Sequence, residues 1–209
     1  VHYLLPEEKS NLFRFVGDNE REPLNEAFGG AGLDPYVSGQ ATVDKGSAGA
    51  VIIRSRPNSM LPDEISGVPV AMLLGRLENI DAFYEQVYNG LIYYGVKMLA
   101  ERAPLYFEEY AKKHKLVRYL YSTTRSDGSK VYGIPAQQSK VVIERHATAQ
   151  TIASLGDHYK IPFINLVKQR KMFSTKDRTD YDTCMADGYS LMALDYTITE
   201  IKKANSNVK

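Results

Sequence analysis

The chain has 209 residues, 44% of them hydrophobic, which suits one sizeable domain with a buried core. Its formal net charge of +1 neither favours nor excludes a nucleic-acid partner, so the local distribution of charge matters more than the total. The single Cys184 excludes an internal disulfide and favours a reducing compartment, and no apolar run approaches the ~20 residues needed to span a membrane.

The N-terminal part changes character near residue 26. Residues 1–25 are polar and contain two prolines, so we predict a linker arm there, followed by one domain over 26–204 and a short tail at 205–209. The domain opens with three short, β-prone apolar runs separated by Gly, Pro, Ser and Asp. This pattern predicts an antiparallel meander of three strands, at 27–33, 50–55 and 68–74.

The middle of the chain alternates helix and strand. Apolar residues recur at helical spacing over 79–94, where Asn79 or Asp81 is expected to cap the start and Gly95 the end. The next expected elements are a short buried strand at 96–100, a helix at 105–114, a strand at 118–123, a turn at Asp127-Gly128 and a helix at 140–155.

The last predicted element is a helix over 187–204, after a weakly patterned stretch that runs through Ser174. Asp187, Leu191, Leu194 and further apolar residues fall on one stripe of this helix, so the Asp187 carboxylate is expected to face the sheet. Strands that first form a meander and then alternate with helices predict an α/β domain with a mixed sheet flanked by helices.

Three acidic residues each lie where an apolar run meets a turn: Asp34, Glu101 and Asp187. A carboxylate at the edge of a core is costly unless a cation compensates it, so this recurrence predicts a metal site. Asp34 and Glu101 both follow expected strands, and ligands of open α/β sheets gather outside the carboxyl ends of strands. Asp182, just upstream of the last helix, is a candidate additional ligand.

Each acid also has an ordinary explanation that the sequence leaves open. Asp34 precedes Pro35 and would start a turn, and Glu101 would be a solvated residue at a strand exit. Asp187 would be a plain helix N-cap, since Asp is favoured at that position. Asp182 would lie in a solvated loop.

Residues 160–178 form a basic segment on an otherwise neutral chain: Lys160, Lys168, Arg170, Lys171, Lys176 and Arg178 oppose Asp177 alone. A localised strip of this kind predicts contacts with phosphates, for which Lys168, Arg170 and Lys171 are the candidates. A solvated helix face or loop is the alternative.

Other chemistries lack their motifs. The four histidines form no HExxH pattern, and one cysteine excludes a Cys-rich zinc site. No GxSxG or GxxxxGK[ST] sequence occurs, so a hydrolase elbow and a P-loop are both excluded. The GGAG run at 29–32 differs from GxGxxG because Asp34-Pro35 follows where a helix would have to start.

The chain resembles the nuclease domain of the large terminase subunit of tailed bacteriophages over residues 28–197. The resemblance rests on GLDPY followed by the apolar hairpin DKGSAGAVIIRS, then VKMLAE, then ADGYSLMALDY. The family carries a paired acid before its last helix in many members, whereas this chain has Ala186 at that position, and Gly188 replaces the usual aliphatic residue. Asp182 is therefore the candidate for a fourth ligand.

The resemblance implies an RNase H-like fold and a metal-dependent endonuclease that cuts concatemeric double-stranded viral DNA during genome packaging. It implies that Asp34, Glu101 and Asp187 hold two Mg²⁺ or Mn²⁺ ions, with Lys168, Arg170 and Lys171 on the DNA backbone. The implied partners are a packaging ATPase domain in the full-length protein, the portal and the small terminase subunit, with no membrane. The implied location is the host cytoplasm, at the procapsid portal during packaging.

Three alternatives remain from the sequence. A junction resolvase has the same fold and would need a two-fold dimer, whereas a proofreading-type exonuclease expects Asp-x-Glu where this chain has Asp34-Pro35-Tyr36. From another class, the chain would be a non-catalytic module that clamps DNA or docks on the portal, which should bind DNA equally well with and without divalent ions.

Overall fold

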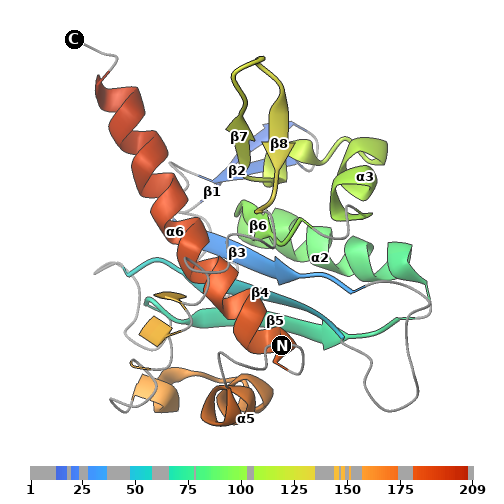
Figure 1. The fold of residues 1–209 in the computed structure, drawn as a ribbon. Coiled ribbons are helices and arrows are strands. Elements are labelled where there is room, and N and C mark those ends of the chain that lie inside the picture. Colours follow the sequence, from blue (N-terminus) through green and yellow to red (C-terminus); the bar gives the residue numbers. More distant parts are fainter. Residues whose placement is uncertain are drawn as a thin grey trace.

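The computed structural model describes residues 13–17, 20–23, 28–36, 48–57, 66–77, 79–102, 106–134, 144–145, 147–148, 151, 157–173 and 181–206. These residues include a four-stranded sheet, and one long helix lies on each of its faces (Figure 1).

The central sheet is built from four strands, β3 (Gly29–Asp34), β4 (Gly49–Ser55), β5 (Pro69–Gly75) and β6 (Met98–Ala100). Their order in the sheet is β5-β4-β3-β6. β3, β4 and β5 form an antiparallel meander, and β6 pairs with the free side of β3 in the parallel direction. The predicted α/β class with a mixed sheet is therefore confirmed.

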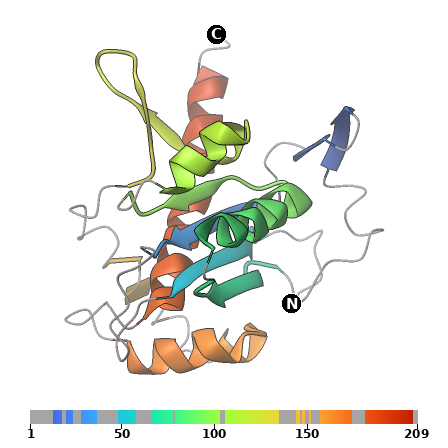
Figure 2. The ribbon, with the colours of Figure 1, turned by 90° about the vertical axis from the view of Figure 1, so that its right-hand side faces the viewer.

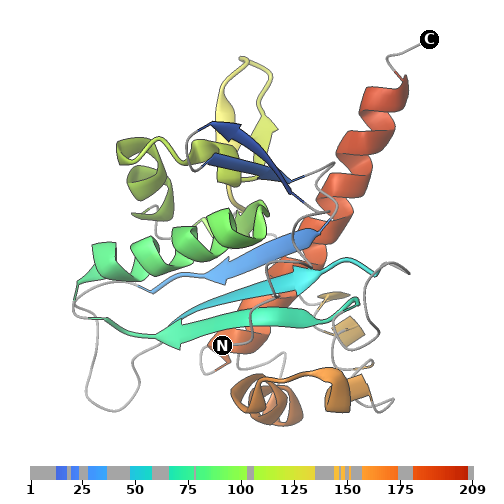
Figure 3. The same ribbon diagram turned by 180° about the vertical axis from the view of Figure 1, so that it is seen from behind.

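The strands are apolar almost throughout because helices cover both faces of the sheet. Helix α2 (Ile80–Tyr94) packs on one face and helix α6 (Asp182–Ser206) on the other, as the front and back views show (Figures 1 and 3). Successive residues of a strand point to opposite faces, and β4 divides accordingly. Val51 and Ile53 join the cluster around α2, whereas Ala50 and Ile52 join the cluster around α6.

Helix α2 has the ends that its sequence predicts. The Asn79 side chain accepts a hydrogen bond of 2.9 Å from the backbone N–H of Asp81, and Gly95 ends the helix in the left-handed conformation with φ 61°. Both are favourable caps, because Asn side chains satisfy free N–H groups and glycine adopts positive φ without strain. The buried stripe of α2 consists of Phe83, Tyr84, Val87, Tyr88, Leu91 and Tyr94.

Helix α6 lies directly on β3 because the strand presents glycines to it. A Cβ atom at Gly32 would lie 2.0 Å from the carbonyl oxygen of Ala186, and one at Gly30 would lie 2.8 Å from Cβ of Ala193. No side chain fits at these positions, so the glycines of the GGAG run allow the helix to pack directly against the strand; this contact is called the glycine seat of α6 below. This explains the motif without any bound nucleotide.

The prediction of a strand at 118–123 is wrong over most of its length. A short 3₁₀ helix, η2 (Val117–Tyr119), comes first, and Leu120 makes only an isolated parallel bridge to Met98. Strand β7 (Ser122–Thr124) then pairs with β8 (Lys130–Tyr132) in a separate hairpin. The expected Asp127-Gly128 turn closes this hairpin, with Asp127 Oδ1 accepting 2.8 Å from the N–H of Ser129. Helix α3 (Tyr106–Lys113) matches its prediction.

Two helical segments lie in the stretch before Ser174, where the sequence shows little hydrophobic periodicity. The 3₁₀ helix η3 (Asp157–Lys160) precedes helix α5 (Ile164–Met172), and α6 begins at Asp182, five positions before the predicted start at Asp187. Asp187 is therefore not an N-cap. The predicted helix over 140–155 falls mostly outside the described residues.

The predicted linker arm contains a small hairpin, in which β1 (Phe13–Gly17) pairs antiparallel with β2 (Glu20–Pro23). Among the helices of the described ranges, none has the length and apolar character required to cross a lipid bilayer.

Candidate functional site

Two of the predicted acids meet at the ends of neighbouring parallel strands. Leu33 of β3 pairs with Ala100 of β6, and the N–H of Glu101 donates a hydrogen bond of 3.1 Å to the carbonyl oxygen of Leu33. The following positions, Asp34 and Glu101, therefore lie side by side at the carboxyl edge of the sheet. Their carboxyl groups share a hydrogen bond, and both residues are partly buried.

The third member of this group is Asp182, the first residue of α6. The helix runs over β3 so that Ala186 and Ser190 lie above Gly32, and Ala193 lies above Gly30. A strand advances about 3.3 Å per residue and a helix about 1.5 Å, so Asp34, two residues beyond Gly32, comes under the first turn of the helix. Asp182 is 9% exposed, and its Oδ2 atom accepts a hydrogen bond of 3.1 Å from the N–H of Ala48.

The three carboxyl groups of Asp34, Glu101 and Asp182, here called the acid cluster, interact electrostatically. Burial raises the pKa of Asp34 well above its usual value, and the nearby charges of Glu101 and Asp182 raise it further. If all three were ionised they would repel one another, and a divalent cation would relieve that repulsion.

The donor atoms of the acid cluster suit a hard cation, because Mg²⁺ and Mn²⁺ prefer carboxylate oxygens and require no histidine. The described residues contain no set of three His, Cys, Asp or Glu side chains already converging on one point as metal ligands. The acid cluster is thus a group of carboxyls of the right chemistry, with one pair hydrogen-bonded to each other, and a cation would have to separate that pair.

Asp187 occupies a different place from the one that the sequence suggests. It faces the sheet as predicted, but its exposure is 0% and each carboxylate oxygen binds an arginine. Oδ1 accepts from Nη2 of Arg54 on β4, and Oδ2 accepts from Nη2 of Arg170 on α5. Burial opposes ionisation of this carboxyl, but the two guanidinium groups outweigh it and lower its pKa to about 2.

The position of Asp187 favours a structural role over the predicted role of metal ligand. Its two oxygens are already taken, and its charge is coupled to Arg54 and Arg170. The physical reason is the earlier start of α6, which moves Asp187 more than a turn into the helix and places Asp182 next to Asp34. Asp182, expected only as an additional ligand, becomes the third acid of the site.

Arg54 is a buried cation that sequence reasoning missed. Its Nε donates a hydrogen bond of 3.3 Å to Oγ of Ser190, and its Nη1 donates one of 2.9 Å to the carbonyl oxygen of Gly67. Burial lowers the pKa of Arg54 although Asp187 opposes that shift. The signal was present in the sequence, because Arg54 shares the strand parity of Ala50 and Ile52 and so must point toward α6.

The basic residues predicted to contact DNA divide between surface and core. Lys168 and Lys171 are exposed on α5, whereas Arg170 is 6% exposed and bound to Asp187. The prediction of a DNA contact by Arg170 does not fit this position, because Arg170 follows Leu166 by four residues and shares its buried helix face. Lys168 and Lys171 remain as the candidates.

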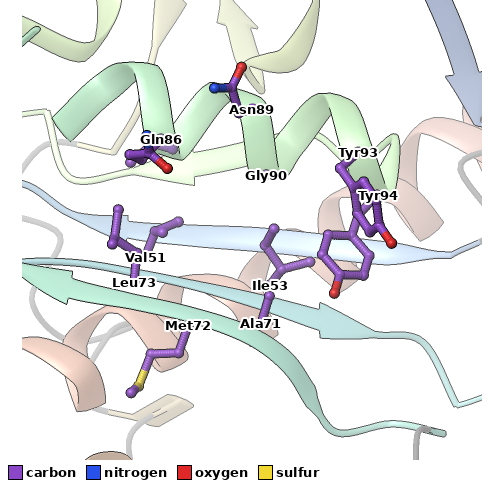
Figure 4. Close-up of a pocket in the computed structure, with 11 residues that line it drawn as sticks. Val51, Ile53, Ala71, Met72, Leu73, Gln86, Asn89, Gly90, Tyr93 and Tyr94 are labelled. Carbon is purple, nitrogen blue, oxygen red and sulfur yellow. The ribbon is translucent and has the colours of Figure 1, made fainter. Parts of the chain in front are cut away.

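A separate hollow of about 270 Å³ lies between α2 and the β4–β5 side of the sheet (Figure 4). Its walls are mostly apolar, with Ile53, Ala71 and Leu73 from the strands and Gly90 and Tyr94 from the helix. Within the described part of the chain no acidic or basic side chain lines it, so those residues offer none of the chemistry of the acid cluster.

The sequence matches no protein-family model, and a comparison with curated proteins finds no match.

Proposed function

We propose that this chain is a metal-dependent DNA endonuclease of the RNase H-like type, acting as the nuclease part of a viral genome-packaging terminase. The observation that carries the proposal is the meeting of Asp34, Glu101 and Asp182 at the carboxyl edge of a meander-plus-parallel sheet. This is the place and the chemistry that such a nuclease requires, since ligands of α/β sheets gather at that edge.

In this proposal Asp34 is the central ligand, flanked by Glu101 and Asp182. Divalent cations held there would supply an activated water and stabilise the leaving oxygen during phosphodiester hydrolysis. The residues of the chain provide the negative charge that binds the cations and fix the distance between strand and helix. Burial and the neighbouring carboxyl groups raise the pKa of Asp34, and a cation would compete with the proton for this carboxyl, so cation affinity should rise with pH.

The exposed Lys168 and Lys171 are proposed to hold the DNA backbone near the acid cluster. Helix α5 lies against the N-terminal end of α6, where Asp182 is located (Figures 1 and 2). Contacts to phosphates carry no base information, so cleavage should depend weakly on sequence and steeply on salt. Within a terminase, the partners would be double-stranded DNA, a packaging ATPase domain, the portal and the small subunit, at the procapsid portal in the host cytoplasm.

The test is cleavage of supercoiled plasmid in Mn²⁺, Mg²⁺ or EDTA. Wild type should nick and linearise DNA only with a divalent ion, and Asp34→Asn and Asp182→Asn should lose this activity. Glu109→Gln is the matched control, because Glu109 is an exposed carboxylate on α3 and should not matter. Folding of each variant would be checked by circular dichroism.

Two outcomes would contradict the proposal. A folded wild type that binds DNA equally well with and without divalent ions, and cuts in neither condition, would indicate the non-catalytic clamp. A metal-dependent dimer that cuts only four-way junctions would indicate a resolvase.

A further inference from the structure

Three residues, Gln169 and Arg170 of helix α5 and Phe173 directly after it, contact the region where α6 begins. The Oε1 atom of Gln169 accepts two hydrogen bonds from Thr183, one of 2.9 Å from its N–H and one of 2.5 Å from its hydroxyl. Arg170 binds Asp187 one turn further along α6. The rings of Phe173 and Tyr181 then meet edge to face, with centroids 5.5 Å apart.

The Gln169 contact acts on the residue next to Asp182. The first N–H groups of a helix have no partner inside the helix, and those that are buried need one from elsewhere. Thr183 is fully buried, so Gln169 satisfies both its N–H and its hydroxyl at once. The Asp182 carboxylate is fixed from the other side by the N–H of Ala48. The first turn of α6 is thus held by residues outside that helix.

We propose that Gln169 is a positioning residue for the acid cluster, holding the first turn of α6 so that Asp182 faces Asp34. This inference rests on the proposed function, since it assigns Gln169 a role at the same cation site. A side chain that orients a metal ligand without touching the metal typically changes metal affinity 10- to 100-fold when removed. A merely structural role would lower stability and leave the cation affinity of the folded protein unchanged.

The experiment compares three substitutions on α5. Gln169→Met keeps the length of the side chain and removes the acceptor, whereas Gln169→Glu keeps an acceptor oxygen for Thr183. Asn165→Ala is the control, because Asn165 is exposed on the same helix. Binding of Mn²⁺ would be measured by calorimetry on the DNA-free protein, with thermal unfolding of each variant in EDTA.

We expect Gln169→Met to bind Mn²⁺ about tenfold more weakly than wild type, with Gln169→Glu and Asn165→Ala close to wild type. In plasmid nicking, kcat should fall in Gln169→Met while KM for DNA changes little, because the lysines that hold DNA are intact.

Several results would overturn the inference. Wild-type Mn²⁺ affinity in a folded Gln169→Met protein would do so while leaving the proposed function standing, as would equal losses in the Met and Glu variants. Absence of Mn²⁺ binding in wild type would instead contradict the proposed function itself. If Gln169→Met fails to fold, Gln169→Ala takes its place, because it also removes the acceptor of both Thr183 donors, and wild-type Mn²⁺ affinity in that variant would equally overturn the inference.

Discussion

At the scale of single residues, the buried group of Arg54, Asp187 and Arg170 has an asymmetry that experiment can detect. One carboxylate lies between two guanidinium groups, so the group carries a net positive charge away from water. Removing Asp187 leaves two buried cations facing each other, whereas removing Arg170 leaves a balanced pair of Arg54 and Asp187. The Nε of Arg170 also has no hydrogen-bond partner among the described residues.

We therefore expect Asp187→Asn to lower the free energy of unfolding by about 3–5 kcal/mol, and Arg170→Met to cost clearly less. Urea denaturation in EDTA would measure both. If Asp187→Asn instead kept its stability and lost only Mn²⁺ binding, Asp187 would be the metal ligand that the sequence predicted.

The same carboxyl gives a pH dependence of known sign. Burial opposes its ionisation, but the arginines lower its pKa from the usual 3.8 to about 2 in the folded protein. A carboxyl with a depressed pKa stabilises the fold above its unfolded pKa, and this stabilisation is lost as pH falls through the folded value. The stability gap between wild type and Asp187→Asn should narrow between pH 4 and pH 2, by on the order of 2 kcal/mol. A gap that stays constant in urea titrations across this range would contradict the assignment.

At the scale of secondary-structure elements, the contact of α6 with β3 depends on glycine. In Gly32→Ala the new Cβ would lie 2.0 Å from the Ala186 oxygen and 2.2 Å from the Ser190 nitrogen, so the helix has to move. We expect a loss of about 3 kcal/mol or more, together with loss of cleavage as Asp182 is displaced. Gly75→Ala on β5 is the control, because no atom of the residues that the structure describes lies within 4 Å of its new Cβ. Equal stability of the two variants in chemical denaturation would refute this contact.

Replacing Gly90, in the middle of α2, is expected to raise the stability of the fold. Gly90 lines the apolar hollow of Figure 4, and among the described residues a new Cβ would meet the end of Ile53 alone, with Cδ1 at 3.3 Å. Replacing a helical glycine by alanine removes about 1 kcal/mol of unfavourable backbone entropy, so Gly90→Ala should raise the Tm by about 2–4 °C. A lower Tm in differential scanning calorimetry would mean that Ile53 cannot yield.

The sequence predicted the elements whose signals are local. The meander, β6 and α2 each follow from their own apolar pattern and caps, and Asp34 and Glu101 follow from the strands that they end. The start of α6 could not be read in this way, because Asp182 and Asp187 are both acceptable first residues. Helix α5 was missed because its buried face includes Arg170, which hides the apolar stripe. Both features involve contacts between residues far apart in the sequence, such as Gln169 with Thr183 and Arg54 with Ser190, which a local pattern does not show.

At the scale of the whole molecule, the DNA binding that we propose should depend on the cations of α5 and not on net charge. Replacing Lys168 and Lys171 together by alanine should reduce the slope of log K against log salt by about 1.8, since each phosphate contact contributes roughly 0.9. Fluorescence anisotropy with labelled duplex in EDTA would measure the slope from 50 to 200 mM salt. Lys112→Ala with Lys113→Ala, two exposed cations on α3, is the control. Equal slopes for the two double variants would place the DNA elsewhere.

The glycine seat of α6 also limits how this molecule can move. Where two backbones touch without side chains between them, there are no rotamers to change, and the strand and the helix behave as one rigid body. Asp34 and Asp182 lie beyond the end of that contact, so a change in their separation is expected to come from the first turn of α6, where Gln169 and Ala48 bind it.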